Sequence, residues 1–163
     1  MHSEIAIDID APADLVFALA HDVRRWSSLL PHYVRSRSID GTLGDGRRSD
    51  EQPESRVVEF VARRPVIPWL GLDLPVAWRS RTWHDAATRR LRFHHTAGVT
   101  RGMDVTWRIE PTGPASCHVV IDHDFAPRLP FLAAIVDRWF TRPIAGRTLA
   151  TFRALAETVH GTP

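Results

Sequence analysis

The stretch Ile5-Ala-Ile-Asp-Ile-Asp-Ala-Pro-Ala-Asp-Leu-Val-Phe-Ala-Leu-Ala20 decides the fold of this chain. Its isoleucines alternate with other residues, which gives a strand with one apolar face. Asp10 is a favourable N-cap, and Pro12 suits the first turn of a helix. The pattern therefore predicts a strand over residues 3–10 that turns directly into a short helix over 13–21.

The stretch Trp26-Ser-Ser-Leu-Leu-Pro-His-Tyr33 predicts a second short helix over 26–31, after which the chain enters a series of strands. Turn residues such as Asp85-Ala-Ala-Thr88 separate runs that alternate in polarity, as hairpins require. Strands joined by short turns form an antiparallel meander. We expect these strands near 33–41, 47–52, 55–63, 76–84, 89–97, 102–111 and 116–125.

The last 35 residues place apolar side chains at helical spacing, which predicts a long C-terminal helix. Pro143 and Gly146 interrupt the pattern and are expected to kink or split it. The apolar positions that we expect on its inner face are Leu132, Ile135, Val136, Trp139, Phe140, Ile144, Phe152, Leu155 and Val159.

The composition is that of a water-soluble globular protein, with 44% hydrophobic and 25% charged residues among 163. We expect one domain over 1–163. The sequence pI is about 9.4, yet all 21 basic residues are arginines spread along the chain, so we expect no nucleic-acid partner. The polar N-terminus predicts no signal peptide, and Phe131–Val136 is too short an apolar run to cross a membrane, so a cytoplasmic protein without stable membrane insertion is expected.

Nearly the whole chain resembles the START-like (SRPBCC) superfamily, and in particular the tetracenomycin-type polyketide aromatase/cyclases. The residues that carry the resemblance are Ile9-Asp-Ala-Pro12, Trp26 with Tyr33, Trp78 with Ser80, Met103-Asp-Val-Thr-Trp107 and His123-Asp-Phe125. The resemblance implies an α+β helix-grip fold. In that fold a curved antiparallel sheet of six to seven strands wraps a long C-terminal helix, two short helices lie near the N-terminus, and a cavity separates sheet and helix.

Strand alternation indicates which side chains face that cavity. Phe93 and His95 share one apolar face, as do Met103 and Trp107 on the next strand. His123 lies on the apolar face of the last strand.

In the strand over 76–84 we favour Trp78, Ser80 and Thr82 as the inward set. Arg81 then faces outward unless a one-residue bulge turns it. In the aromatase/cyclases a pocket arginine follows this Trp and Ser, and an ungapped comparison places Thr82 there with Arg81 beside it.

Two interpretations of His95 stay open: an imidazole placed for proton transfer, or a strand-end histidine that meets solvent or a backbone carbonyl. For His123 the second interpretation is favoured, since Asp122 and Asp124 flank it. Tyr33 is either a hydrogen-bond donor to a substrate carbonyl or a core aromatic residue with a satisfied hydroxyl. The histidines show no metal-ligand spacing, so neither a metal nor a cofactor is expected.

Two functions are compatible with these residues. The first, implied by the resemblance, is an aromatase/cyclase that folds a possibly carrier-bound poly-β-ketone for aldol closure and dehydration. His95 would move protons, with a pH–rate limb in the ordinary histidine range, and Tyr33 would polarise a carbonyl with help from Arg81 or Thr82. The expected substrate-binding residues are Trp26, Trp78, Ser80, Thr82, Phe93, Met103, Trp107, His123 and Trp139.

The second function is non-catalytic binding or transfer of a quinone or lipid. Leu29-Leu30-Pro31 resembles the corresponding turn of coenzyme Q-binding relatives. The apolar stretch Val66–Leu72 is expected either as a lid or membrane contact, or as an edge strand buried against the sheet.

Overall fold

The computed structural model describes residues 1–39, 55–67, 72–127 and 130–161. The strand expected over 47–52 and the tip of the apolar stretch, residues 68–71, lie outside the described residues.

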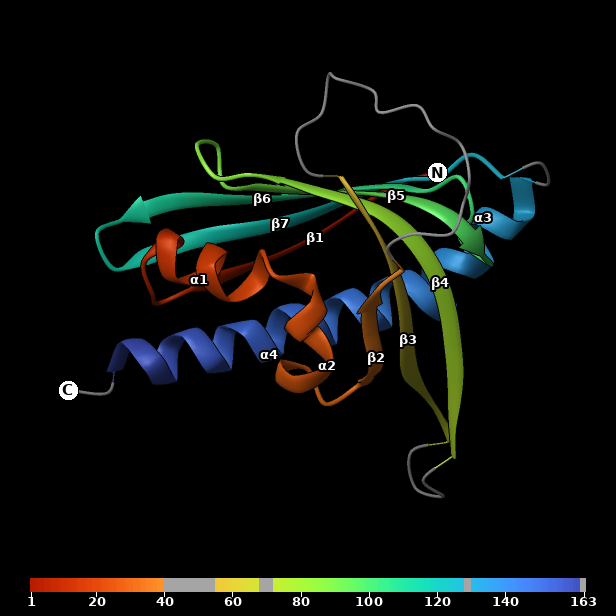
Figure 1. Cartoon of the computed structure of the whole chain (residues 1–163), viewed down its shortest axis with the longest axis horizontal. Helices are drawn as coiled ribbons and strands as arrows, with labels where there is room; N and C mark the ends of the chain where they lie inside the picture. The colour runs from red at the N-terminus through yellow and green to blue at the C-terminus, as the bar shows by residue number, and fades with distance from the viewer. Residues whose placement is uncertain (40–54, 68–71, 128–129, 162–163) are drawn as a thin grey trace.

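Seven strands form one antiparallel sheet in the order β1-β7-β6-β5-β4-β3-β2, and a long C-terminal helix packs against it, as the helix-grip prediction requires. Figure 1 shows β1, β6 and β7 crossing on one side of the helix, while β3 and β4 bend down past it. The elements are β1 His2–Ile9, α1 Ala13–Ala20, η1 Val23–Arg25, α2 Trp26–Leu29, β2 Tyr33–Ser38, β3 Arg56–Ile67, β4 Leu72–Asp85, β5 Arg90–Gly98, β6 Asp104–Gly113, β7 Ser116–Asp124, α3 Pro130–Val136, η3 Asp137–Thr141 and α4 Arg142–Gly161.

The helix α1 begins at Ala13, as predicted, but its N-cap differs from the predicted one. Pro12, rather than Asp10, is its N-cap residue, and the Pro12 carbonyl accepts the main-chain N–H of Leu15 and Val16. Asp10 is exposed, and its own N–H donates to a carboxylate oxygen of Glu157 at 3.1 Å. The physical reason is that the chain stays extended through Pro12, whose ψ is 139°, so the side chain of Asp10 is too far upstream to cap.

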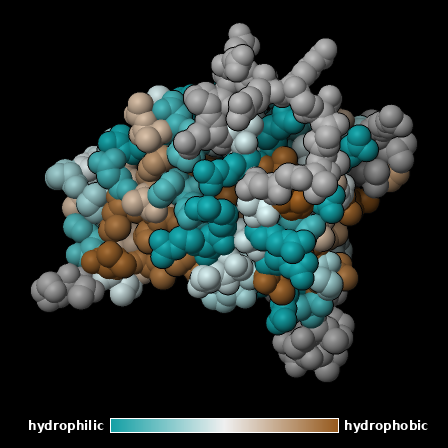
Figure 2. Space-filling view, viewed as in Figure 1, coloured by the Kyte–Doolittle hydropathy of each residue, from teal (hydrophilic) through white to brown (hydrophobic). Residues whose placement is uncertain are grey.

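The predicted alternation of strand faces is confirmed. Phe93, Met103 and Trp107 are buried on the concave face of the sheet, whereas Arg92 and Asp104 are exposed on the other face. Figure 2 shows hydrophilic residues over much of one side of the molecule, with hydrophobic residues gathered mainly towards α1. The core therefore lies between the concave face and the helices.

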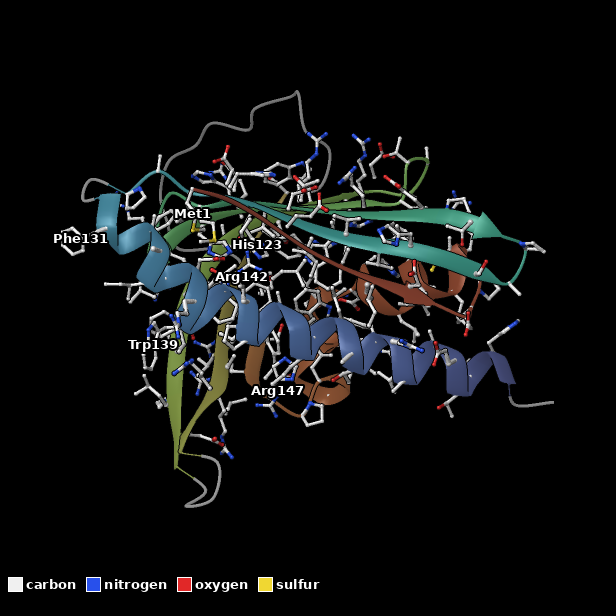
Figure 3. All side chains as sticks on the ribbon, turned by 180° about the vertical axis from the view of Figure 1, so that it is seen from behind. Met1, His123, Phe131, Trp139, Arg142 and Arg147 are labelled. Carbon is white, nitrogen blue, oxygen red and sulfur yellow. The ribbon has the colours of Figure 1, made fainter. Side chains whose placement is uncertain are left out.

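The C-terminal helical region bends but does not separate into two helices with a gap. A π-helical turn, η3, joins α3 to α4 directly before Pro143. Proline has no N–H for the carbonyl four residues earlier and its ring crowds that carbonyl, so a wider turn at this point relieves both problems. Figure 3 shows α3 meeting the line of α4 at an angle.

The π turn corrects the predicted inner face of this region. It adds a residue to one turn, so the helical spacing counted from α4 no longer holds towards α3. Ile135 and Trp139 are 46% and 48% exposed, and Val159 near the chain end is 53% exposed. Phe140, Ile144 and Phe152 do pack inward. Among the described helices, none is both long and apolar enough to cross a membrane.

Candidate functional site

A cavity of about 80 Å³ lies between the concave face of the sheet and η3–α4. Eight of the predicted site residues line it: Trp26, Tyr33, Trp78, Phe93, His95, Met103, Trp107 and His123. Five further residues line it and belong to no pattern of functional residues in the sequence: Phe60, Thr100, Thr141, Ala145 and Thr148. The lining comes from α2, from the six strands β2 to β7, from the β5–β6 turn, and from η3 and α4.

Trp26 lines the cavity and packs against several of the rings around it. Its ring centroid lies 5.4 Å from those of Tyr33 and Trp107, and 5.7 Å from that of Phe93. The indole N–H donates to the Ala20 carbonyl at 2.9 Å, which satisfies the one polar group of the side chain. Interlocked aromatic rings of this kind give the cavity a fixed shape.

His95 faces the cavity from β5, with a relative exposure of 8%. Its Nδ1 lies 2.6 Å from the Thr100 hydroxyl, and its ring stacks on Trp78 at 6.0 Å. The hydroxyl of Thr100 therefore contacts Nδ1 and not the other ring nitrogen, Nε2. Burial, together with the nearby His123 and His94, lowers the pKa of His95 to about 3. The imidazole is therefore neutral at physiological pH.

The β5–β6 turn brings the Thr100 side chain within hydrogen-bond distance of His95. Gly98 has φ +97°, and a Cβ there would lie 2.6 Å from the Ala77 carbonyl oxygen. Only glycine allows this close approach to β4 at a positive φ. The turn can then fold back, and the His95 N–H donates to the Met103 carbonyl at 2.9 Å.

His123 is buried, so it does not meet solvent, but a hydrogen bond with the Ser3 backbone agrees with the backbone contact that the favoured interpretation also allowed. Its relative exposure is 5%, and its Nδ1 has no hydrogen-bond partner among the described residues. The flanking Asp122 and Asp124 belong to the opposite strand face, so they do not draw it outward. Burial lowers the pKa of His123 to about 4. Figure 3 shows its ring between the sheet and the helix, near Arg142.

Tyr33 is held by the C-terminal helix. Its hydroxyl hydrogen-bonds to the Thr148 side chain, and burial raises its pKa above the ordinary value, so the phenol keeps its proton. Nε2 of the buried His32 lies 2.9 Å from the same Thr148 oxygen. Thr148 thus links two neighbouring residues at the start of β2 to α4.

The remaining predicted site residues lie outside the cavity. Arg81 is exposed on the convex face. The register between β4 and β5 does shift by one residue, but the extra residue belongs to β5. The alternation of side chains along β4 is therefore unchanged, and Arg81 stays outside. Ser80 is fully buried, but its hydroxyl donates to the His94 carbonyl at 3.1 Å and does not line the cavity. Trp139 is rotated outward by the π turn.

Thr82 faces inward as predicted but lines a different hollow. This second hollow, of about 260 Å³, lies between η1 and the β3–β5 strands and is bordered by His21, Arg56 and His84. Phe93 lines both spaces. Thr82 is therefore separated from Tyr33 and His95, and the family's pocket arginine has no equivalent at this position.

No carboxylate or arginine side chain lines the first cavity among the described residues. Its polar groups are hydroxyls and the neutral rings of His95 and His123, so it favours a neutral ligand group. With its pKa lowered to about 3, His95 titrates below the ordinary histidine range. Within the described residues no three His, Cys, Asp or Glu side chains gather as metal ligands would.

The model of the family described as "Polyketide cyclase / dehydrase and lipid transport" matches residues 9–152. The chain belongs to this family. A curated relative, the granaticin polyketide synthase bifunctional cyclase/dehydratase of Streptomyces violaceoruber, is 27% identical over 163 residues. The match covers 97% of this chain but 44% of the relative, so this chain spans less than half of that protein.

Solved structures share the helix-grip fold. The Zhui aromatase/cyclase from Streptomyces sp. R1128 has a TM-score of 0.74 at 20% identity, covering 96% of this chain and 93% of that one. The di-domain aromatase/cyclase BexL from the BE-7585A biosynthetic pathway has a TM-score of 0.71 at 24% identity, covering 99% of this chain and 48% of that one. This chain therefore shares the fold of these aromatase/cyclases.

Proposed function

We propose that this protein holds the reacting part of a poly-β-ketone in the first cavity and promotes aldol cyclisation followed by dehydration. One observation carries the proposal: two neutral imidazoles and a phenol face one mainly apolar space without charged side chains among the described residues. A neutral base and a neutral donor around an apolar cavity suit chemistry that passes through an enolate. The names of the relatives, cyclase/dehydratase and aromatase/cyclase, agree with this chemistry.

In the proposed reaction, Nε2 of His95 takes a proton from a carbon that lies between two substrate carbonyls. The resulting enolate carbon attacks a second carbonyl carbon, and the oxygen that gains the charge accepts a hydrogen bond from the Tyr33 hydroxyl. The protonated His95 returns its proton to that oxygen, which becomes a hydroxyl. His95 then takes a proton from the neighbouring carbon and passes it to the hydroxyl, which leaves as water while the carbon–carbon double bond forms. The rings of Trp26, Trp78 and Trp107 restrict the chain so that the two reacting carbons meet.

The cavity volume limits what enters without movement of the walls. About 80 Å³ is less than the roughly 150 Å³ of an engineered apolar cavity that binds benzene in another protein. The proposal therefore places only the reacting segment in the cavity unless the aromatic side chains move.

A second candidate function is binding or transfer of a hydrophobic molecule without turnover. The pKa of His95, about 3, favours this candidate, because a base is most effective when its pKa lies near the working pH. The neutral, apolar lining would accept a quinone ring as readily as a polyketone.

Mass spectrometry of a surrogate poly-β-ketone thioester, incubated with the purified protein, tests the proposal. Loss of water and a cyclised product, formed faster than without protein, are expected. The His95→Ala variant should lose most of this activity. Tight binding of the surrogate by the wild-type protein with no change in its mass would instead support the binding function.

A further inference from the structure

Arg64 lies at the end of the inner row of β3. Strand alternation places Phe60, Ala62 and Arg64 on one face, and Phe60 lines the first cavity. Val76, the partner of Ala62 on β4, lines it too, whereas Leu74, the partner of Arg64, is 47% exposed. Arg64 is therefore one step beyond the cavity wall, where the concave face opens to solvent.

Two aromatic rings of η3 border the guanidinium of Arg64. Its Cζ lies 4.7 Å from the centroid of the Trp139 ring and 6.0 Å from that of Phe140. Trp139 is half exposed, while Phe140 lines the cavity. Figure 3 shows Trp139 on the side of the helix that faces the long strands of the β3–β4 hairpin. These contacts place the guanidinium at the rim of the cavity, between its wall and solvent.

The charge of Arg64 has no anionic partner among the described residues. No described carboxylate lies within ion-pair distance, and no described residue accepts a hydrogen bond from its buried Nε. On the opposite face of the sheet, Arg35 and Arg79 both pair with Glu59, at 3.5 and 3.4 Å. A buried donor without a partner is costly, so Arg64 is a strong site for an added acceptor.

We infer that Arg64 binds an oxyanion at the cavity rim, so the ligand combines an apolar body with a carboxylate or phosphate end. A planar guanidinium can give two parallel hydrogen bonds to either group. Trp139 holds the guanidinium plane from its outer side. The inference rests on the proposed function only in placing the ligand body in the first cavity, and it needs no turnover.

Three probes with the same alkyl chain test the inference: octanoate, octyl phosphate and octanol. Their dissociation constants are measured by titration with intrinsic tryptophan fluorescence, since Trp26, Trp78 and Trp107 line the cavity. The test variant is Arg64→Gln. The matched control is Arg63→Gln, because Arg63 is the next residue along, is exposed and belongs to the other strand face.

Arg64→Gln should weaken octanoate and octyl phosphate about tenfold, as expected for a hydrogen bond to a charged group, and leave octanol within about twofold. Arg63→Gln should change none of the three. A loss for one anion alone identifies the carboxylate or the phosphate as the group that Arg64 binds.

Equal affinity of both anions for the wild-type protein and Arg64→Gln would overturn the role of Arg64 while octanol binding still supports the cavity. If none of the probes binds to the wild-type protein, the cavity as a ligand site and the role of Arg64 are both wrong. If octanol binds and Arg63→Gln weakens the anions as much as Arg64→Gln, general charge rather than a site explains the binding.

Discussion

Nδ1 of His95 lies 2.6 Å from the hydroxyl oxygen of Thr100, and both side chains are buried at the edge of the cavity. The contact engages one ring nitrogen and leaves Nε2 for a substrate. Thr100 comes from the β5–β6 turn rather than from a neighbouring strand. The orientation of the imidazole therefore depends on the turn as well as on the sheet.

His95→Ala should lower the rate of cyclisation by about 10²–10⁴, the usual contribution of a general acid or base. Tyr33→Phe should cost less, since it removes one donor and keeps the aromatic wall. Because the pKa of His95 is about 3, the wild-type rate should show no limb from His95 between pH 5 and 8. Rates from pH 4 to 8 measured on all three proteins check this. Full activity in both variants would show that the two residues only line the cavity and take no part in the reaction.

Acid should destabilise the protein through its buried histidines. The pKa of His123 falls from 6.5 in the unfolded chain to about 4 in the fold, so between these values the unfolded state binds the extra proton. The free energy of unfolding contributed by this group is therefore complete above pH 6.5 and declines by roughly 1.4 kcal/mol per pH unit as the pH falls towards 4.

His123→Gln should make the loss of stability between pH 7 and pH 5 smaller by about 2 kcal/mol. Urea unfolding at the two pH values measures this. His118→Gln on the outer face of the same strand is the matched control, since His118 contacts the exposed Asp8. A loss of stability in His123→Gln as large as in the wild-type protein would show that His123 is not protonated on unfolding.

Two glycine substitutions should have opposite effects. Gly98→Ala should destabilise the protein by at least about 1–3 kcal/mol, because φ is +97° and the new Cβ would lie 2.6 Å from the Ala77 oxygen. Gly146→Ala should stabilise α4 by about 0.5–1 kcal/mol, since it is helical and nothing lies within 4 Å of the added Cβ. Chemical denaturation of both variants checks the pair, and two changes of the same sign would contradict it.

The strand faces could be predicted because a half-buried sheet requires a period of two. This rule correctly placed Phe93 and His95 inside and left Arg81 outside. It also placed Thr82 inside, but it could not show that Phe93 separates Thr82 from the first cavity. The face on which a side chain lies follows from its position along one strand. Which cavity it lines depends also on the side chains from other strands and helices that divide the interior.

Contacts between distant segments could not be read from the sequence. His32 and Thr148 meet across 116 positions, and neither belongs to a recognisable pattern of functional residues. A weak signal existed for Thr148, which lies four residues after the inward Ile144. Trp139 was placed inside because regular helical spacing was assumed through Pro143, and the π turn there breaks that assumption.

The central claim is that the ligand reacts inside the first cavity, and filling that cavity tests it most directly. Ala145 lines the cavity of about 80 Å³ from α4, so Ala145→Leu should fill much of it. Ala154→Leu on the exposed side of the same helix is the matched control. The measurement is the rate of water loss from the surrogate poly-β-ketone, by mass spectrometry, on variants with wild-type circular dichroism. The account predicts that the wild-type protein and Ala154→Leu convert the surrogate and Ala145→Leu does not. Conversion by Ala145→Leu at the wild-type rate, or no conversion by the wild-type protein above the protein-free rate, would contradict it.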